Sequence, residues 1–166
     1  MTNREPDDDV LPIIGDDATL REPADDANRA IVDGDAVRAV QSASRVIEML
    51  EGTRGPTDEG VLAWRAFRAR ALIDAFRFAE AQIELRAVLA IRTSLSGAEA
   101  RSTLRIRADL VEAQRRAGRP DEALVLAREL LADRRRIHGE DDPQTRQIQR
   151  VVDELVALLE GPDDHR

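Results

Sequence analysis

Apolar residues recur at helical spacing along most of the chain, most regularly near its C-terminal end. Between residues 143 and 160 they fall at i, i+3, i+4, i+7, i+8 and i+11, namely Ile148, Val151, Val152, Leu155, Val156 and Leu159. That spacing places them on one face of a helix. We therefore predict an amphipathic helix over residues 143–160. A similar apolar stripe predicts another helix around residues 123–131.

Glycine and proline mark the ends of the two helices that precede residues 143–160. Residues 104–117 form one helical stretch, and Gly118 can take the left-handed conformation that ends it. Pro120 suits the first turn of the next helix, where its missing N–H group costs nothing. Gly139 ends that helix, and Asp142 fits the N-cap position before Pro143.

The sequence repeats without gaps at a period of 42 residues. Glycines at 55, 97 and 139 share one phase, and alanines at 39, 81 and 123 share another. Trp64 falls in phase with Ile106 and Ile148. Glycine or proline interrupts the pattern about every 21 residues, which argues against a coiled coil of six heptads. Such a period is typical of a solenoid, although a simple antiparallel helix bundle stays open.

The turns between the predicted helices resemble those of tetratricopeptide repeats (TPRs). Residues 118–123, Gly-Arg-Pro-Asp-Glu-Ala, are similar to the turn within such a repeat. Residues 139–145, Gly-Glu-Asp-Asp-Pro-Gln-Thr, resemble the Gly-Pro-Asp-His-Pro-x-Thr linker of the 42-residue variety found in kinesin light chains and many actinobacterial proteins. Asp142 stands where histidine is usual. In the middle copy Phe76 replaces the glycine found at 34 and 118, so that turn lacks its usual helix stop.

The resemblance covers about residues 21–160 and implies an all-α fold, a right-handed superhelical solenoid of antiparallel helix pairs. We expect repeats at about 21–62, 63–104 and 105–142, followed by a C-terminal capping helix over 143–160, because solenoids need terminal caps. Residues 1–20 are expected to form a disordered acidic leader and residues 161–166 a frayed tail. Trp64 and Phe67 are expected in the core between repeats.

Charge is unevenly distributed. The net charge is −8, and residues 1–26 contribute −7 of it, through nine acidic residues and two arginines. Residues 10–14 form a short apolar patch in this leader. Either the leader is a disordered segment that solubilises the chain, or its apolar patch docks in a groove of this chain or of a partner. All 25 basic residues are arginine, which suggests a GC-rich bacterial genome. The chain has no cysteine, so a disulfide framework, a thiol nucleophile and a cysteine-ligated zinc site are excluded.

The resemblance also implies that the first helices of the repeats line a concave groove that holds peptides. The candidate groove residues are Asn28, Arg70, Arg105, Asp109, Glu112, Arg150 and Glu154. Arginine pairs bidentately with carboxylates, which suits an acidic peptide or a C-terminus. The alternative is that such residues only form solvated i,i+4 pairs that stabilise their helices. The Lys-and-Asn carboxylate clamp of chaperone-binding relatives is absent, because the chain has no lysine.

Residues 101–136 form a basic strip with ten arginines and six acidic residues. The strip could bind the phosphate groups of a nucleic acid. Alternatively, it could hold the acidic leader in an autoinhibitory contact. No aromatic residues interleave with these arginines and no helix-turn-helix motif is present, so we expect no nucleic-acid partner.

Catalysis finds little support in the sequence. Of the two histidines, His138 lies at a predicted helix end, where a cation complements the helix dipole, and His165 lies in the tail. There is no Ser–His–Asp order, phosphate loop or metal-ligand spacing. No apolar run approaches the roughly 20 residues that span a membrane. We expect a cytoplasmic, non-enzymatic protein with no cofactor, no metal site and no membrane partner.

These observations predict a protein- or peptide-binding scaffold or adaptor. One alternative is a regulatory or sensor domain of a bacterial signalling system. Another is a structural oligomerisation unit whose exposed repeat ends stack, so a homo-oligomer stays open. Three repeats form a small groove, so we expect a short ligand bound with modest affinity.

Overall fold

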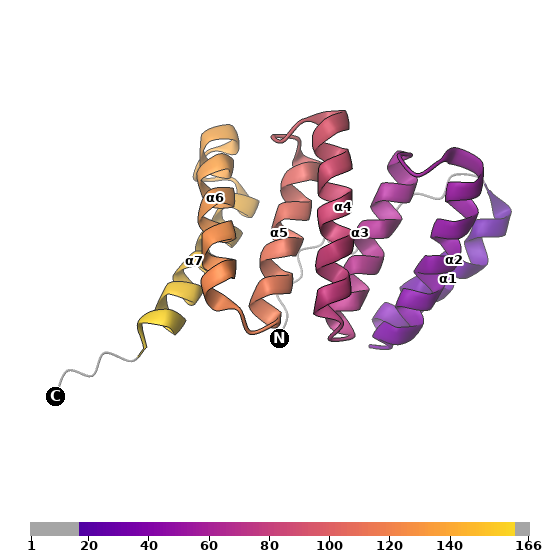
Figure 1. Ribbon diagram of the computed structural model, residues 1–166, viewed down its shortest axis with the longest axis horizontal. Helices are drawn as coiled ribbons and strands as arrows, with labels where there is room; N and C mark the ends of the chain where they lie inside the picture. Colours follow the sequence, from indigo (N-terminus) through magenta and orange to yellow (C-terminus); the bar gives the residue numbers. More distant parts are fainter. Residues whose placement is uncertain (1–16, 162–166) are drawn as a thin grey trace. The chain divides into compact units, whose positions relative to one another are not determined.

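The structure is a computed structural model that describes residues 17–161. All regular structure in these residues is α-helical, and the helices follow one another as α1 (Ala18–Val32), α2 (Ala36–Arg54), α3 (Glu59–Asp74), α4 (Phe78–Ser96), α5 (Arg101–Arg116), α6 (Pro120–His138) and α7 (Pro143–Glu160) (Figure 1). The expectations for residues 1–16, including the apolar patch of the leader, and for residues 162–166 lie outside the described residues.

The helix starts recur with the period seen in the sequence. The second helices α2, α4 and α6 begin at residues 36, 78 and 120, and the first helices α3, α5 and α7 begin at 59, 101 and 143. The expected divisions at 62/63 and 104/105 fall inside α3 and α5, so whole helix pairs begin at Glu59 and Arg101. α1 begins at Ala18, within the expected leader, because the Asp17 side chain accepts the backbone N–H of Thr19 at 3.0 Å and caps the helix.

Phe76 adopts the backbone conformation that was expected to require glycine. Its φ is 60°, close to the 74° of Gly34 and the 73° of Gly118 at the equivalent positions. The expectation that this position lacks a helix stop is therefore wrong, because the phenylalanine itself takes the left-handed conformation. A residue with a Cβ atom pays roughly 1–2 kcal/mol for it, since Cβ crowds the following carbonyl oxygen.

The described helices fall into two compact units. The first contains α1 to α3 and ends at Ala75, and the second contains α4 to α7 and begins at Phe76. In the first unit α2 packs against both α1 and α3. Its core consists of Leu20, Ala24, Ala27, Ala43, Val46, Ile47, Leu50, Val61 and Trp64. Trp64 is fully buried and its ring meets that of Phe67 edge-on at 5.2 Å, so the expected core role of both residues is confirmed.

A polar network also joins α1 to α2. One carboxylate oxygen of Asp26, Oδ1, accepts hydrogen bonds from Nε and Nη2 of Arg38 at 3.0 and 2.5 Å, and Oδ2 accepts one from the Ser42 hydroxyl. These bonds, chiefly those from Arg38, hold the pKa of Asp26 at about 2. The carboxylate therefore stays charged and links the two helices over the whole physiological pH range.

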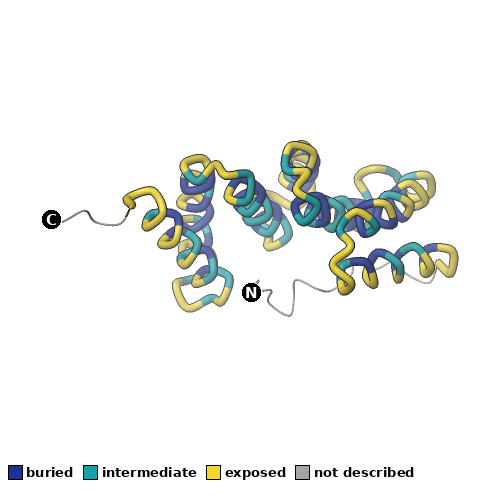
Figure 2. Tube along the Cα trace, turned by 90° about the horizontal axis from the view of Figure 1, so that it is seen from below, coloured by how far each residue is buried: buried dark blue, intermediate teal, exposed yellow. Residues whose placement is uncertain are grey.

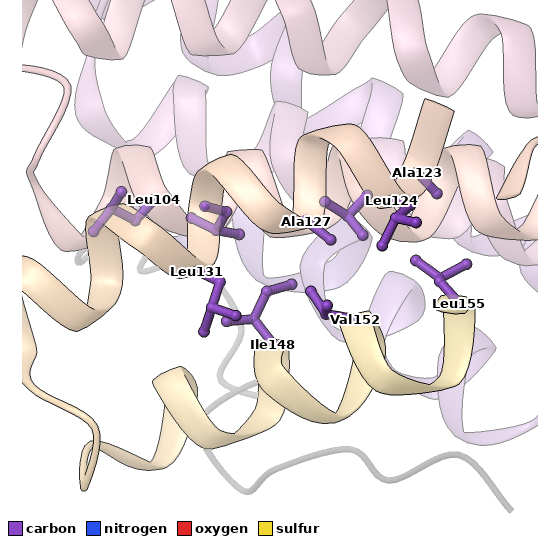
Figure 3. Close-up of a cluster of buried hydrophobic side chains, with 10 residues drawn as sticks. Leu104, Ala123, Leu124, Ala127, Leu131, Ile148, Val152 and Leu155 are labelled. Carbon is purple, nitrogen blue, oxygen red and sulfur yellow. The ribbon is translucent and has the colours of Figure 1, made fainter. Parts of the chain in front are cut away.

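In the second unit each helix packs against the next, from α4 through α5 and α6 to α7. The main core cluster draws on α5, α6 and α7 and consists of Leu104, Val111, Ala123, Leu124, Ala127, Leu130, Leu131, Ile148, Val152 and Leu155. Figure 3 shows Leu131, Ile148 and Val152 gathered where α6 faces α7. The buried and exposed positions alternate along each helix in Figure 2, as an amphipathic pattern requires.

The free face of α7 is polar, although α7 begins in phase with α5. On α5, Leu104 and Val111 pack into the cluster with α6, and Arg107 forms an ion pair with Asp133 of α6 at 2.6 Å. The residues of α7 at the equivalent positions are Arg146, Gln149 and Asp153. Because Arg146 and Asp153 are exposed, α7 presents a water-compatible surface there and acts as the predicted capping helix.

Candidate ligand-binding surface

Four of the predicted binding residues occupy the same position of the repeat. Asn28 lies on α1, Arg70 on α3, Glu112 on α5 and Glu154 on α7, each 42 residues after the one before. Asn28 and Glu154 are exposed, whereas Arg70 and Glu112 are half-buried. Every described first helix thus presents one polar residue at this position, two in the first unit and two in the second.

Arg115 connects Glu112 with Glu154 electrostatically. Its Nε donates to Oε2 of Glu112 at 2.8 Å and its Nη2 donates to Oε1 at 2.9 Å. The hydrogen bonds to Glu112, together with the charges of Glu112 and of Glu154 on α7, raise the pKa of the Arg115 guanidinium. The pair is about 40% exposed on each side, and such surface pairs contribute only about 0–1 kcal/mol to stability. A ligand could therefore exchange with either partner at small cost to the fold.

Arg105 and Asp109 stand one turn apart on α5, before Glu112. Both are half-buried, and both interact with neighbouring groups of the protein. Like Glu112, each therefore already has an interaction within the protein. Arg150 and Glu154 stand one turn apart on α7 and are both exposed.

The first turn of α7 is held by Asp142. Its Oδ1 accepts the backbone N–H groups of Gln144 at 3.1 Å and Thr145 at 3.0 Å. Burial alone would raise the pKa of Asp142, but the N–H group of Thr145 and the charges of Arg101 and His138 hold it below its usual value. Arg101 at the start of α5 reaches Oδ2 at 3.8 Å. Asp142, which stands where histidine is usual in the linker, therefore caps α7 and lies close to the start of α5.

The basic strip expected over residues 101–136 is largely paired with carboxylates. Arg107 pairs with Asp133 at 2.6 Å, and Arg136 pairs with Glu99 at 2.7 Å. Together with the Arg115–Glu112 pair, these contacts show that several arginines of the strip already face carboxylates of the protein itself. Sequence reasoning treated Arg115 only as part of this strip; the i,i+3 spacing from Glu112 was the signal for their pairing.

Residues 17–161 contain no group of three or more histidine, cysteine, aspartate or glutamate side chains that could hold a metal ion. None of the described helices is long and apolar enough to cross a membrane.

Comparison with known proteins agrees with this arrangement. Residues 103–144 match the tetratricopeptide-repeat family model. The crystal structure of the nearly identical TPR-like repeats of a Podosopora anserina protein named as a kinesin light chain matches with a TM-score of 0.72 at 23% identity. The match covers 82% of this chain and 65% of that one, and a point variant of the same repeats gives the same values. No curated protein matches the chain.

These matches confirm the predicted resemblance and fold class. The chain has a TPR solenoid fold, built from antiparallel helix pairs. Such folds generally serve as non-catalytic scaffolds for protein–protein interaction.

Proposed function

We propose that the chain is a cytoplasmic scaffold or adaptor that binds a protein or peptide through the surface of its first helices. The observation that carries the proposal is the recurrence of one polar, solvent-accessible residue at the same position of α1, α3, α5 and α7. Positions that recur from one helix pair to the next are those from which solenoids generally build binding surfaces.

The charges along α5 and α7 support a ligand of mixed character. Arg115 and Arg150 can pair with a carboxylate of the ligand, and Glu112 and Glu154 can accept its N–H groups or pair with a basic side chain. An extended peptide offers both kinds of group along its length. Because these groups are exposed, binding should weaken as ionic strength rises.

A two-stage experiment tests this proposal. A pull-down from the native lysate first identifies the partner, and calorimetry then measures its affinity for the triple variant Arg70→Ala, Arg105→Ala, Glu112→Ala. We expect at least a tenfold loss of affinity, because charge-assisted hydrogen bonds contribute about 1.5–3 kcal/mol each. Glu154→Ala, at an exposed site, repeats the test with less risk to folding.

The matched control changes polar residues outside the first helices. Arg128 and Glu129 are exposed on the second helix α6, and Arg128→Ala, Glu129→Ala should leave the affinity unchanged. If the triple variant and Glu154→Ala both bind the recovered partner as the wild type does, the assignment of the first helices is wrong.

A further inference from the structure

Two glutamines form a buried polar pair where α4 packs against α5. Gln82 on α4 is 9% exposed and Gln114 on α5 is 2% exposed. Nε2 of Gln82 donates a hydrogen bond to Oε1 of Gln114 at 2.9 Å, and Nε2 of Gln114 donates one to Oε2 of Glu122 on α6 at 2.7 Å. An ionised carboxylate only accepts hydrogen bonds, so Glu122 determines that the Gln114 oxygen faces Gln82. The two buried amides therefore satisfy each other across the contact.

This glutamine pair has no counterpart in the other repeats. All four residues at the equivalent positions, 42 residues before and after, are apolar. They are Val40 on α2 with Leu72 on α3, and Leu124 on α6 with Val156 on α7. The first three are buried, and Val156 is half-buried and packs against the core cluster of α5 to α7. The repeat fold therefore does not require polar groups at this contact.

The repeats otherwise resemble one another, which gives each helix more than one potential partner. A second helix packs against the next first helix three times, as α2 with α3, α4 with α5 and α6 with α7. The buried faces of the second helices are alike, with alanine at 39, 81 and 123 and valine or leucine at 46, 88 and 130. Misassembly between similar elements is a characteristic failure of repeat proteins.

A wrong pairing of α4 or α5 separates the two glutamines. If α4 packed on α7, Gln82 would face Val156, and if α2 packed on α5, Gln114 would face Val40. Each arrangement leaves a buried amide opposite an apolar side chain. A buried polar group without a partner disfavours a state roughly tenfold or more. Both amides have a partner when α4 packs on α5.

We propose that Gln82 and Gln114 select the pairing of α4 with α5 and so keep the repeats in their order along the solenoid. This role differs from stabilisation, because two apolar side chains of similar shape hold such a contact as well or better. A single buried polar residue has the same effect in coiled coils, where it specifies register and the number of chains. The proposal concerns the assembly of the repeats and does not depend on the ligand surface of the first helices.

Replacing both glutamines by the residues of the first repeat tests the proposal. Gln82→Val, Gln114→Leu gives the α4–α5 contact the same residues as positions 40 and 72. The double variant should resist urea at least as well as the wild type, because no buried amide is left without a partner. After refolding from urea, however, the share of backbone amide NMR signals outside the native set should rise roughly tenfold or more, because the penalty on wrong pairings is gone.

A matched control changes the equivalent contact without changing its polarity. Leu124→Val, Val156→Leu on α6 and α7 should keep the single native set of signals. Gln82→Leu, Gln114→Val, which copies the third repeat, repeats the test with the larger side chain on α4. Either glutamine-free variant refolding to one native set of signals, or the control gaining as many extra signals, overturns the proposal. If neither glutamine-free variant folds, the glutamines are needed for stability itself, which also overturns it.

The single variants test whether the two amides depend on each other. Gln82→Val alone or Gln114→Leu alone leaves one buried amide without its partner. Each should therefore lower the equilibrium constant of folding roughly tenfold relative to the double variant. Urea denaturation of the wild type, the two single variants and the double variant measures this coupling. Single variants as stable as the double variant would show two independent amides and would overturn the proposal.

Discussion

Phe76 combines a disfavoured backbone with an exposed aromatic ring. The ring lies 6.0 Å from that of Phe78, edge-on, and the Arg116 guanidinium lies 5.7 Å from its centroid. Aromatic pairs contribute about 0.5–1.5 kcal/mol and exposed cation–π contacts about 0.5–1 kcal/mol, so these contacts offset part of the backbone strain. Side-chain contacts thus favour phenylalanine where backbone conformation favours glycine.

Two substitutions at position 76 separate the stabilising contacts of the ring from the cost of the left-handed backbone. Phe76→Ala removes the ring but keeps a Cβ atom in the left-handed conformation, so it should lower the free energy of unfolding. Phe76→Gly removes the ring and the strain together, and should be more stable than Phe76→Ala by about 1 kcal/mol. Urea denaturation measures both. An alanine variant as stable as the glycine variant would show that the left-handed conformation carries no strain.

The first helices α3, α5 and α7 begin in the same backbone conformation but differ in side-chain capping. The residues before α3, α5 and α7 have nearly the same extended conformation, with φ and ψ of −60° and 140° at Asp58, −60° and 140° at Ala100, and −62° and 131° at Asp142. The aspartates accept backbone N–H groups of the following turn, whereas Ala100 has no side chain that can. The start of α5 is therefore the uncapped member of this set.

Ala100→Asp should supply the missing cap. The backbone at Ala100 already has the conformation in which Asp58 caps α3, so no rearrangement is required. We expect Ala100→Asp to raise the free energy of unfolding by about 1 kcal/mol. The reverse change at the start of α7, Asp142→Ala, should lower it by about the same amount. Thermal or urea denaturation measures the change. Asp142→Ala also loses the contact with Arg101, so a loss smaller than the gain at Ala100 would contradict the capping argument.

The sequence predicts a helix and its ends correctly where the residue types involved have a single structural role. The apolar spacing over residues 143–160 and the proline at 143 predicted α7 with its observed bounds. The expected start near residue 21 missed the first turn of α1, because the capping Asp17 lies in an acidic run where it does not stand out. The 42-residue phase placed the candidate residues on first helices. It could not show that Glu154 on α7 raises the pKa of Arg115 on α5, because that interaction depends on packing between elements.

At the scale of the whole molecule, two groups of buried residues lie one in each unit, and further buried residues such as Leu62 and Leu85 belong to neither group. One group is centred on Trp64 and draws on α1 to α3, and the other draws on α5 to α7 and includes Leu130, which is fully buried. In a repeat protein each element is stabilised mainly by its nearest neighbours, so the two groups need not unfold together. This arrangement predicts which helices are destabilised when a core side chain is removed.

Hydrogen exchange with mass spectrometry on Trp64→Ala and Leu130→Ala tests that prediction. Both should destabilise their own surroundings by several kcal/mol, about 3–5 for tryptophan and about 2–5 for leucine, because each leaves a cavity in a packed core. Trp64→Ala should remove amide protection in α1 to α3 before it does so in α5 to α7, and Leu130→Ala should do the reverse. Val125→Ala, at an exposed position of α6, should change little. If either core variant lowered protection equally in all helices, the chain would unfold as one cooperative body, and the stability of each group of helices would depend directly on the other.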